Sequence, residues 1–149
     1  MEASENYAKI LSHSQIFNGI DLKDLVSLVK EAKVLHPKPG SLLIEEEHRV
    51  PGLHVILEGS AQLVKAGQQL TVFGRGAFFG EISLFGVALG ATASILVGND
   101  PSTFLLITSE VLSAWAKLYP EAERIFLRKM CVELSRRVYL SNEKLSKSI

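Results

Sequence analysis

The spacing of hydrophobic residues changes twice along the chain and predicts three regions. Residues 1–36 carry apolar side chains at helical spacing, residues 37–108 carry short apolar runs separated by glycines, and residues 109–149 return to helical spacing. Pro37 and the Pro39-Gly40 pair mark the first change, because proline and glycine interrupt helices. We therefore expect a single domain in which N-terminal and C-terminal helices flank a central β-structure.

The first region is expected to contain two helices. Tyr7, Ile10 and Leu11 give residues 3–13 one apolar face, which predicts a short amphipathic helix. Asp21 is a good N-cap for the second helix, because its side chain can accept a hydrogen bond from an amide of the first turn. The apolar face of this second helix consists of Leu22, Leu25, Val26, Leu28 and Val29.

Six short apolar runs occupy the central region: LLI, LHVIL, AQLV, LTVF, ASILV and TFLLI. Glycines and other turn-forming residues separate them, so that turn signals recur about every 8–12 residues. Such spacing is typical of a β-sandwich or a β-barrel. The central region is therefore expected to be a closed or two-layered β-structure.

Two helices are expected in the last region, a short one capped by Ser109 and a long one over residues 121–146. Pro120 stands at the start of the long helix, where proline is tolerated. Apolar residues at alternating spacing of four and three form a stripe on the long helix, which is typical of a short coiled coil. We call this set the partner stripe: Leu127, Cys131, Leu134, Val138 and Leu145.

A second apolar face of the same helix carries Ile125, Phe126, Met130 and Tyr139. One packing surface needs only one apolar face. We therefore expect the second face to cover the β-structure and the partner stripe to contact another helix, either of a second copy or of a different protein. The alternative is that both faces cover the β-structure. Ser141 interrupts the partner stripe and limits it to about two heptads.

Glycines and aromatic residues concentrate in the segment GRGAFFGEISLFGVALGAT, residues 74–92. Gly80 precedes Glu81, and the short apolar turn ISLF follows. A helix that begins there leaves the amides of Ile82 and Ser83 without partners, which favours an anion or a polar oxygen above them. The pattern predicts either a cradle for a small ligand or a tight turn with a solvated Glu81.

The run GAFFGEISLF resembles the phosphate-binding cassette of cyclic-nucleotide-binding domains, whose pattern is G-x-x-F-G-E-[IL]-[AS]-L, a loop, and P-R-x-[AS]-T. The segments LSHSQIFNGIDLKDLVSLVKEAKVLHPKPGSLLIEEE and HVILEGSAQLV resemble that family's entry helices, first strands and hairpin. The resemblance covers nearly the whole chain. It implies an eight-stranded β-roll, or double-stranded jelly roll, with N-terminal helices, a short cassette helix and two C-terminal helices.

The resemblance also implies a ligand site over the cassette, residues 76–92. In the family the carboxylate at the position of Glu81 takes the ribose 2′-hydroxyl of a cyclic nucleotide. The implied ligand-binding residues of this chain are Gly80, Glu81, Ile82, Ser83, Gly90, Ala91 and Thr92.

The chain departs from the family pattern at Leu89. Ala88 and Leu89 stand where the family has Pro-Arg, and that arginine pairs with the cyclic phosphate. A leucine cannot make this charge-assisted, bidentate contact. Arg75 is the nearest candidate for a substitute cation. Without a substitute, the departure implies weak or absent binding of cyclic nucleotides.

Composition narrows the classes of function. The chain has 149 residues, is 47% hydrophobic and has zero formal net charge, which fits a globular protein and argues against nucleic-acid binding by bulk charge. The only cysteine, Cys131, excludes an intrachain disulfide and fits a reducing compartment. The start MEASENYAK has no apolar segment typical of a signal peptide, so a cytoplasmic protein is expected. The uncharged residues 82–99 contain turn signals and are expected to form a buried helix, loop and strand rather than a membrane span.

Catalysis and DNA reading are not expected. A cupin-type metal site needs two histidines at i and i+2 on one strand, whereas His36, His48 and His54 lack this spacing and are expected to be solvated loop residues. Cys131 has no arranged histidine or aspartate partner. The run Glu45–Glu47 is expected to be a solvated strand end, in place of the family's Glu-Gly turn. Bacterial regulators of the family continue into a helix-turn-helix, whereas this sequence stops after the long helix.

Two hypotheses of function follow. The favoured one is a non-enzymatic regulatory and interaction module with weak or absent cyclic-nucleotide binding, whose partner is a second copy or another protein. The alternative is a genuine sensor of cAMP, cGMP or an uncharged nucleoside. No cofactor, metal, DNA or membrane partner is expected in either case.

Overall fold

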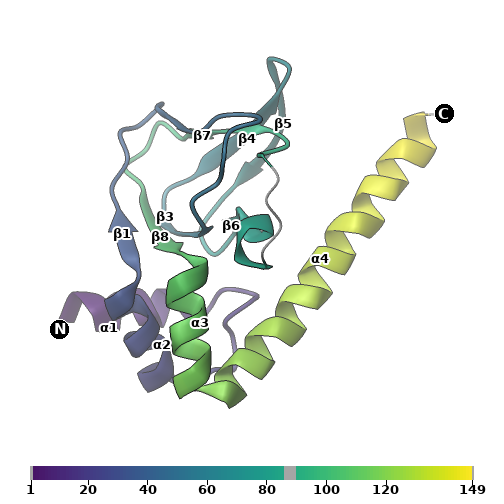
Figure 1. Ribbon diagram of the computed structural model, residues 1–149. Coiled ribbons are helices and arrows are strands. Elements are labelled where there is room, and N and C mark those ends of the chain that lie inside the picture. The colour runs from purple at the N-terminus through teal and green to yellow at the C-terminus, as the bar shows by residue number, and fades with distance from the viewer. Residues whose placement is uncertain (1, 86–89, 149) are drawn as a thin grey trace.

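Eight strands form two four-stranded antiparallel sheets in the computed structural model, which describes residues 2–85 and 90–148 (Figure 1). The first sheet has the order β1-β8-β3-β6, with β1 (Lys33–Leu35), β8 (Thr103–Ile107), β3 (Leu53–Glu58) and β6 (Phe78–Phe79). The second has the order β2-β7-β4-β5, with β2 (Leu42–Ile44), β7 (Ser94–Val97), β4 (Ala61–Lys65) and β5 (Gln68–Phe73). The predicted eight-stranded β-roll with flanking helices is confirmed.

The six apolar runs of the sequence correspond to β2, β3, β4, β5, β7 and β8. Two strands, β1 and β6, are not among these runs, because β1 directly follows the helical pattern of the first region and β6 has only two residues. The helical pattern of the first region ends at Glu31, and β1 follows it before Pro37 is reached. The prediction that the proline ends the helix is therefore wrong.

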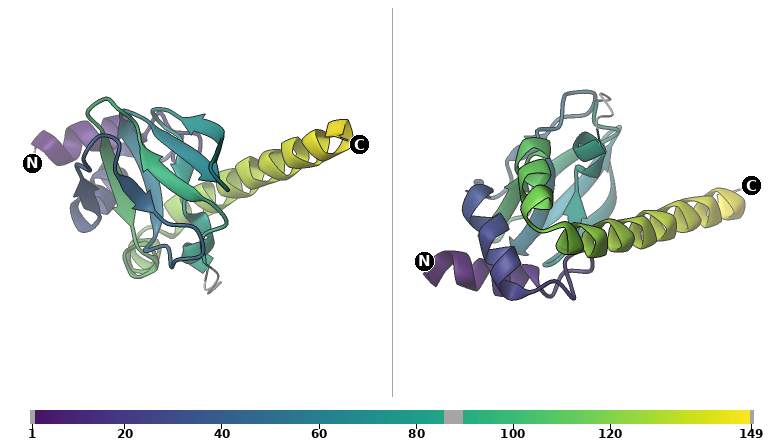
Figure 2. Two further views of the ribbon diagram at one scale, coloured as in Figure 1. Left: turned by 90° about the horizontal axis from the view of Figure 1, so that it is seen from above. Right: turned by 60° about the horizontal axis from the view of Figure 1, so that its bottom comes forward.

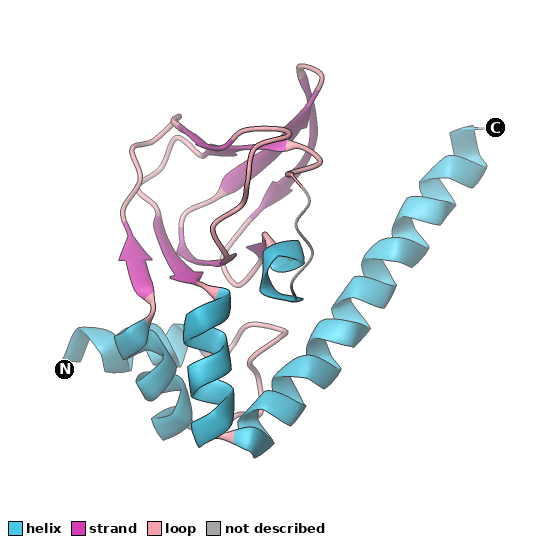
Figure 3. Cartoon of the chain, in the orientation of Figure 1, coloured by secondary structure: helices cyan, strands magenta, loops and turns pink. Residues whose placement is uncertain are grey.

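The helices lie at one end of the roll, and the last of them continues from there along its side (Figure 3). They are α1 (Glu2–Leu11), α2 (Leu22–Glu31), α3 (Ser109–Leu118) and α4 (Pro120–Ser148), and a short 3₁₀-helix, η1 (Glu81–Phe85), follows β6. Asp21 occupies the N-cap of α2 as predicted, although its side chain makes no capping hydrogen bond. The N-cap of α3 is Thr108 rather than the predicted Ser109, because the Thr108 hydroxyl accepts a hydrogen bond from the Val111 amide.

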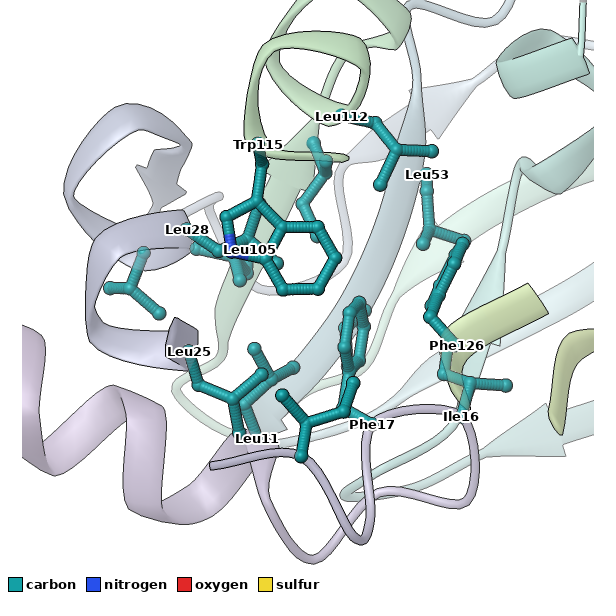
Figure 4. Packing of buried hydrophobic residues seen from close by; sticks show 14 of the residues in the cluster. Leu11, Ile16, Phe17, Leu25, Leu28, Leu53, Leu105, Leu112, Trp115 and Phe126 are labelled. Carbon is teal, nitrogen blue, oxygen red and sulfur yellow. The ribbon is translucent and has the colours of Figure 1, made fainter. Parts of the chain in front are cut away.

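A cluster of buried side chains joins the helices to the first sheet (Figure 4). The ring of Phe17, from the loop after α1, stacks on the ring of Phe126 of α4 with a centroid separation of 4.9 Å. The edge of Trp115 from α3 meets the same Phe17 ring at 6.5 Å. Phe126 is fully buried, so this contact fixes the base of α4 against the body of the protein.

A second buried cluster fills the space between the two sheets and includes Ile56, Phe79 and Phe104. The helix α4 runs past the side of the roll that carries β6 and η1, and its C-terminal end projects away from the body in every view (Figure 2). Within residues 2–85 and 90–148, no helix combines the length and the hydrophobicity that a bilayer crossing requires.

Candidate functional site

The cassette turns sharply at Gly80, between β6 and η1. Gly80 has φ of 84°, which is costly for any residue with a side chain. A Cβ atom at Gly80 would lie 2.4 Å from the carbonyl oxygen of Gly52. Gly90, near the end of the cassette, is constrained in a similar way, because a Cβ there would lie 2.3 Å from the Glu47 carbonyl oxygen. Close backbone packing therefore requires both glycines.

A cavity of about 170 Å³ opens between the cassette and the two sheets. Apolar side chains of both sheets form its floor: Ile44, Leu63, Phe73, Phe79 and Ile95. The charged groups that line it are Glu81 and Arg137. We call this cavity the cassette pocket.

The structure places all seven predicted ligand-binding residues around the cassette pocket: Gly80, Glu81, Ile82, Ser83, Gly90, Ala91 and Thr92. The predicted degenerate position, Leu89, lies outside the described residues. The open amide predicted at Ser83 is wrong. That amide donates to the Gly80 carbonyl at 3.3 Å, and the Ser83 hydroxyl donates to the same oxygen at 2.8 Å. The reason is that a 3₁₀-turn forms its first backbone hydrogen bond at i+3.

The cation in the cassette pocket comes from α4. Arg137 Nη2 donates to the Phe78 carbonyl at 2.6 Å, and Nη1 lies 3.6 Å from Oε1 of Glu81. The Arg137 guanidinium also stacks over the Phe78 ring at 3.9 Å. Both charged side chains are partly buried, with exposed fractions of 36% for Arg137 and 18% for Glu81.

Sequence reasoning missed Arg137, although one signal could have found it. Residues seven apart share a helix face. Phe126 and Met130 were expected to cover the β-structure, and both are buried. Arg137 lies seven residues beyond Met130 and therefore faces the body as well. The predicted substitute cation, Arg75, instead lines a separate hollow beside Ile10 and His13.

His54 lies directly behind the cassette turn and is buried on β3. Its ring stacks on that of Phe79 with a centroid separation of 4.9 Å, and its Nδ1 donates to the Gly52 carbonyl at 3.0 Å. Burial lowers the pKa of His54 from 6.5 to about 4, and the hydrogen bond to Gly52 opposes part of this change. The prediction of a solvated loop histidine is wrong for His54, whereas His36 and His48 are exposed as expected.

Part of the partner stripe packs against the body of the protein, and part of it is exposed to solvent. Leu127 and Leu134 pack against the edge of the helix-covered core, whereas Cys131 is exposed and Val138 is 61% exposed. The side chain of Leu145 lies outside the described residues. On the second face, Phe126 and Met130 are buried and Ile125 is partly buried, but Tyr139 is 63% exposed and does not cover the roll.

The run Glu45–Glu47 is more than a solvated strand end. The side chains of Glu45 and Glu47 are exposed as expected, but the Glu47 amide donates to the Ala91 carbonyl at 2.8 Å. The Ala91 amide donates in turn to the His48 carbonyl at 2.9 Å. Glu47 has φ of 72°, a conformation that glycine adopts without strain. This turn therefore holds the cassette beside Gly90.

A sequence model described as "Cyclic nucleotide-binding domain" matches residues 34–118, which is more than half of the chain. Among solved structures, a cyclic nucleotide-binding domain from Methylobacillus flagellatus has a TM-score of 0.82 at 19% identity, covering 99% of this chain and 85% of that chain. The Thermus thermophilus catabolite activator protein has a TM-score of 0.73 at 18% identity, covering 89% of this chain and 62% of that chain. No curated protein matches the sequence.

A third similar structure is the regulatory domain of Toxoplasma gondii PKA, which was crystallised with cAMP. It has a TM-score of 0.65 at 23% identity, and the match covers 76% of this chain and 44% of that chain. At these identities the structural matches establish the shared fold.

Proposed function

Because the chain belongs to the cyclic nucleotide-binding domain family, we propose that it is a non-enzymatic regulatory and interaction module in which cyclic nucleotides bind weakly or not at all. The leucine at position 89, where the family pattern has the arginine that pairs with the cyclic phosphate, carries this proposal.

Two magnitudes support weak binding. Losing one partner of a charge-assisted bidentate pair costs about 2–5 kcal/mol, which is roughly one and a half to three and a half decades of affinity. Leu89 stands at the position of that partner. In addition, the cassette pocket of about 170 Å³ is smaller than the roughly 300–1,000 Å³ typical of pockets for drug-sized ligands.

Calorimetry with cAMP and cGMP tests the proposal. We expect no heats of micromolar binding for the unaltered protein, and new or stronger binding for Leu89→Arg. Leu89→Gln is the matched control, because it adds a polar side chain without a charge. Micromolar heats for the unaltered protein, with no gain from Leu89→Arg, would favour the alternative function of a cAMP or cGMP sensor. The cAMP bound to the Toxoplasma domain supports that alternative.

We further propose that the partner stripe pairs with the same helix of a second copy. The exposure of Cys131 and Val138 on a helix that projects from the body supports this pairing. A parallel helix pair places each stripe residue opposite its own copy, so mild oxidation is expected to form a Cys131–Cys131 crosslink. Leu134→Glu should abolish both the crosslink and the dimer in light scattering, whereas exposed Arg128→Glu is the control.

A monomer at about 100 μM that Leu134→Glu leaves unchanged would instead assign the stripe to a different protein. The zero formal net charge of the chain supports a protein partner rather than DNA. The single free cysteine supports a reducing compartment, which we take to be the cytoplasm.

A further inference from the structure

The two charged side chains that line the cassette pocket have unused hydrogen-bonding capacity. Nη1 of Arg137 and Oε1 of Glu81 are 3.6 Å apart, whereas charge-assisted hydrogen bonds measure about 2.7–2.9 Å. Among the described residues, Arg137 makes one hydrogen bond, from Nη2 to the Phe78 carbonyl. A guanidinium has five N–H donors, so most of the donors of Arg137 are available to a ligand.

The guanidinium is also held in place by two contacts. Its central carbon lies 3.9 Å from the centre of the Phe78 ring, and Nη2 donates a hydrogen bond to the Phe78 carbonyl. A pre-oriented planar fork suits a carboxylate or a phosphate group, because both can accept two parallel hydrogen bonds. Behind this fork the pocket floor is apolar and is formed by Leu63, Phe73 and Phe79 among others.

We propose that Arg137 is the anion-binding residue of the cassette pocket, and that the pocket takes a compact organic monoanion with a hydroxyl next to its anionic group and an apolar body. The anionic group accepts hydrogen bonds from Arg137, and the hydroxyl donates to Glu81. The apolar body lies on the floor of the pocket. Charges of opposite sign then alternate, and each group has a partner.

Charge and size set this ligand class. Glu81 and Arg137 together contribute no net charge, so a dianion would be repelled by Glu81 without a second cation to offset it. A cyclic nucleotide also places an anionic group, its cyclic phosphate, near a hydroxyl of its ribose, but it does so on a larger molecule. The volume of about 170 Å³ favours the smaller molecule. This inference rests on the proposed function in one respect: both start from a cassette, residues 76–92, that contains no arginine.

The chosen probe is 2-hydroxyisocaproate, which has one carboxylate, an adjacent hydroxyl and a branched apolar tail. Isocaproate lacks only the hydroxyl, and cAMP represents the nucleotide source of the same chemistry. NMR titration of the full chain measures the affinities, since a ligand this small is expected to bind with a Kd on the order of 1 mM. We expect 2-hydroxyisocaproate to bind more tightly than either isocaproate or cAMP.

Arg137→Gln is expected to weaken binding of 2-hydroxyisocaproate at least tenfold. Arg136→Gln is the matched control, because it removes the same charge from the next residue, which contacts Glu133 at 3.4 Å and lines a different hollow. Glu81→Gln should bring the two acids to equal affinity, since the hydroxyl then loses its charged acceptor. Should Arg137→Gln unfold the chain, Arg137→Lys keeps the charge without the fork and should weaken binding severalfold.

Three results would overturn the inference. They are no binding of 2-hydroxyisocaproate, equal weakening by Arg136→Gln and Arg137→Gln, and binding that neither Arg137 variant alters. Tight cAMP binding that is indifferent to Arg137→Gln would contradict both this inference and the proposed function. Weak cAMP binding together with unaltered hydroxy-acid binding in Arg137→Gln would contradict the inference alone.

Discussion

Acid should destabilise this fold through His54, whose pKa is lowered from 6.5 to about 4 by burial. Between these two values the unfolded chain binds a proton that the folded chain excludes, so stability falls as the pH falls. The contribution of His54 is complete above pH 6.5 and is lost progressively toward pH 4. A shift of one pKa unit corresponds to about 1.4 kcal/mol, so the whole loss is about 3 kcal/mol.

Urea unfolding at several pH values between 7 and 4 measures this loss. His54→Phe preserves an aromatic ring against Phe79 but cannot take up a proton. Its free energy of unfolding should depend less steeply on pH than that of the unaltered protein, by about 1.4 kcal/mol per pH unit within the window. His48→Phe is the control, since His48 is exposed. Parallel pH profiles for the unaltered protein and His54→Phe would refute a buried neutral His54.

Two further predictions concern backbone conformation and are also read from urea unfolding. Glu47→Gly should raise the free energy of unfolding by up to about 1 kcal/mol, because glycine adopts the φ of 72° without strain; Glu45→Gly is the control and should lower it. Gly80→Ala should lower it by more than about 2 kcal/mol, because a Cβ there lies 2.4 Å from the Gly52 carbonyl. Gly67→Ala is the control, because Gly67 has a similar φ of 77° and a Cβ there would meet no atom within 4 Å. An equal loss of stability in both glycine variants would contradict the close contact at Gly80.

Local patterns predicted those parts of the fold that local sequence determines. The strands β2, β3, β4, β5, β7 and β8 were visible as apolar runs, and the contiguous cassette brought its predicted residues to one pocket. The strand β1 and its register depend on pairing with β8, which lies about seventy residues away and leaves no local pattern. His54 is an intermediate case. It stands inside the apolar run LHVIL, and that position indicated burial more strongly than its polarity indicated exposure.

The cation of the cassette pocket shows why a site cannot be completed from its motif alone. The motif predicted a pocket without a cation, because it considered residues 76–92 and their neighbours in sequence. Arg137 reaches the pocket because Phe126 is packed under Phe17 and directs α4 along the side of the roll. Eleven residues of helix separate Phe126 from Arg137, a rise of about 16 Å. The cation of the pocket therefore depends on a hydrophobic contact about 16 Å away along α4, and Arg137 lies on the same helix as the partner stripe.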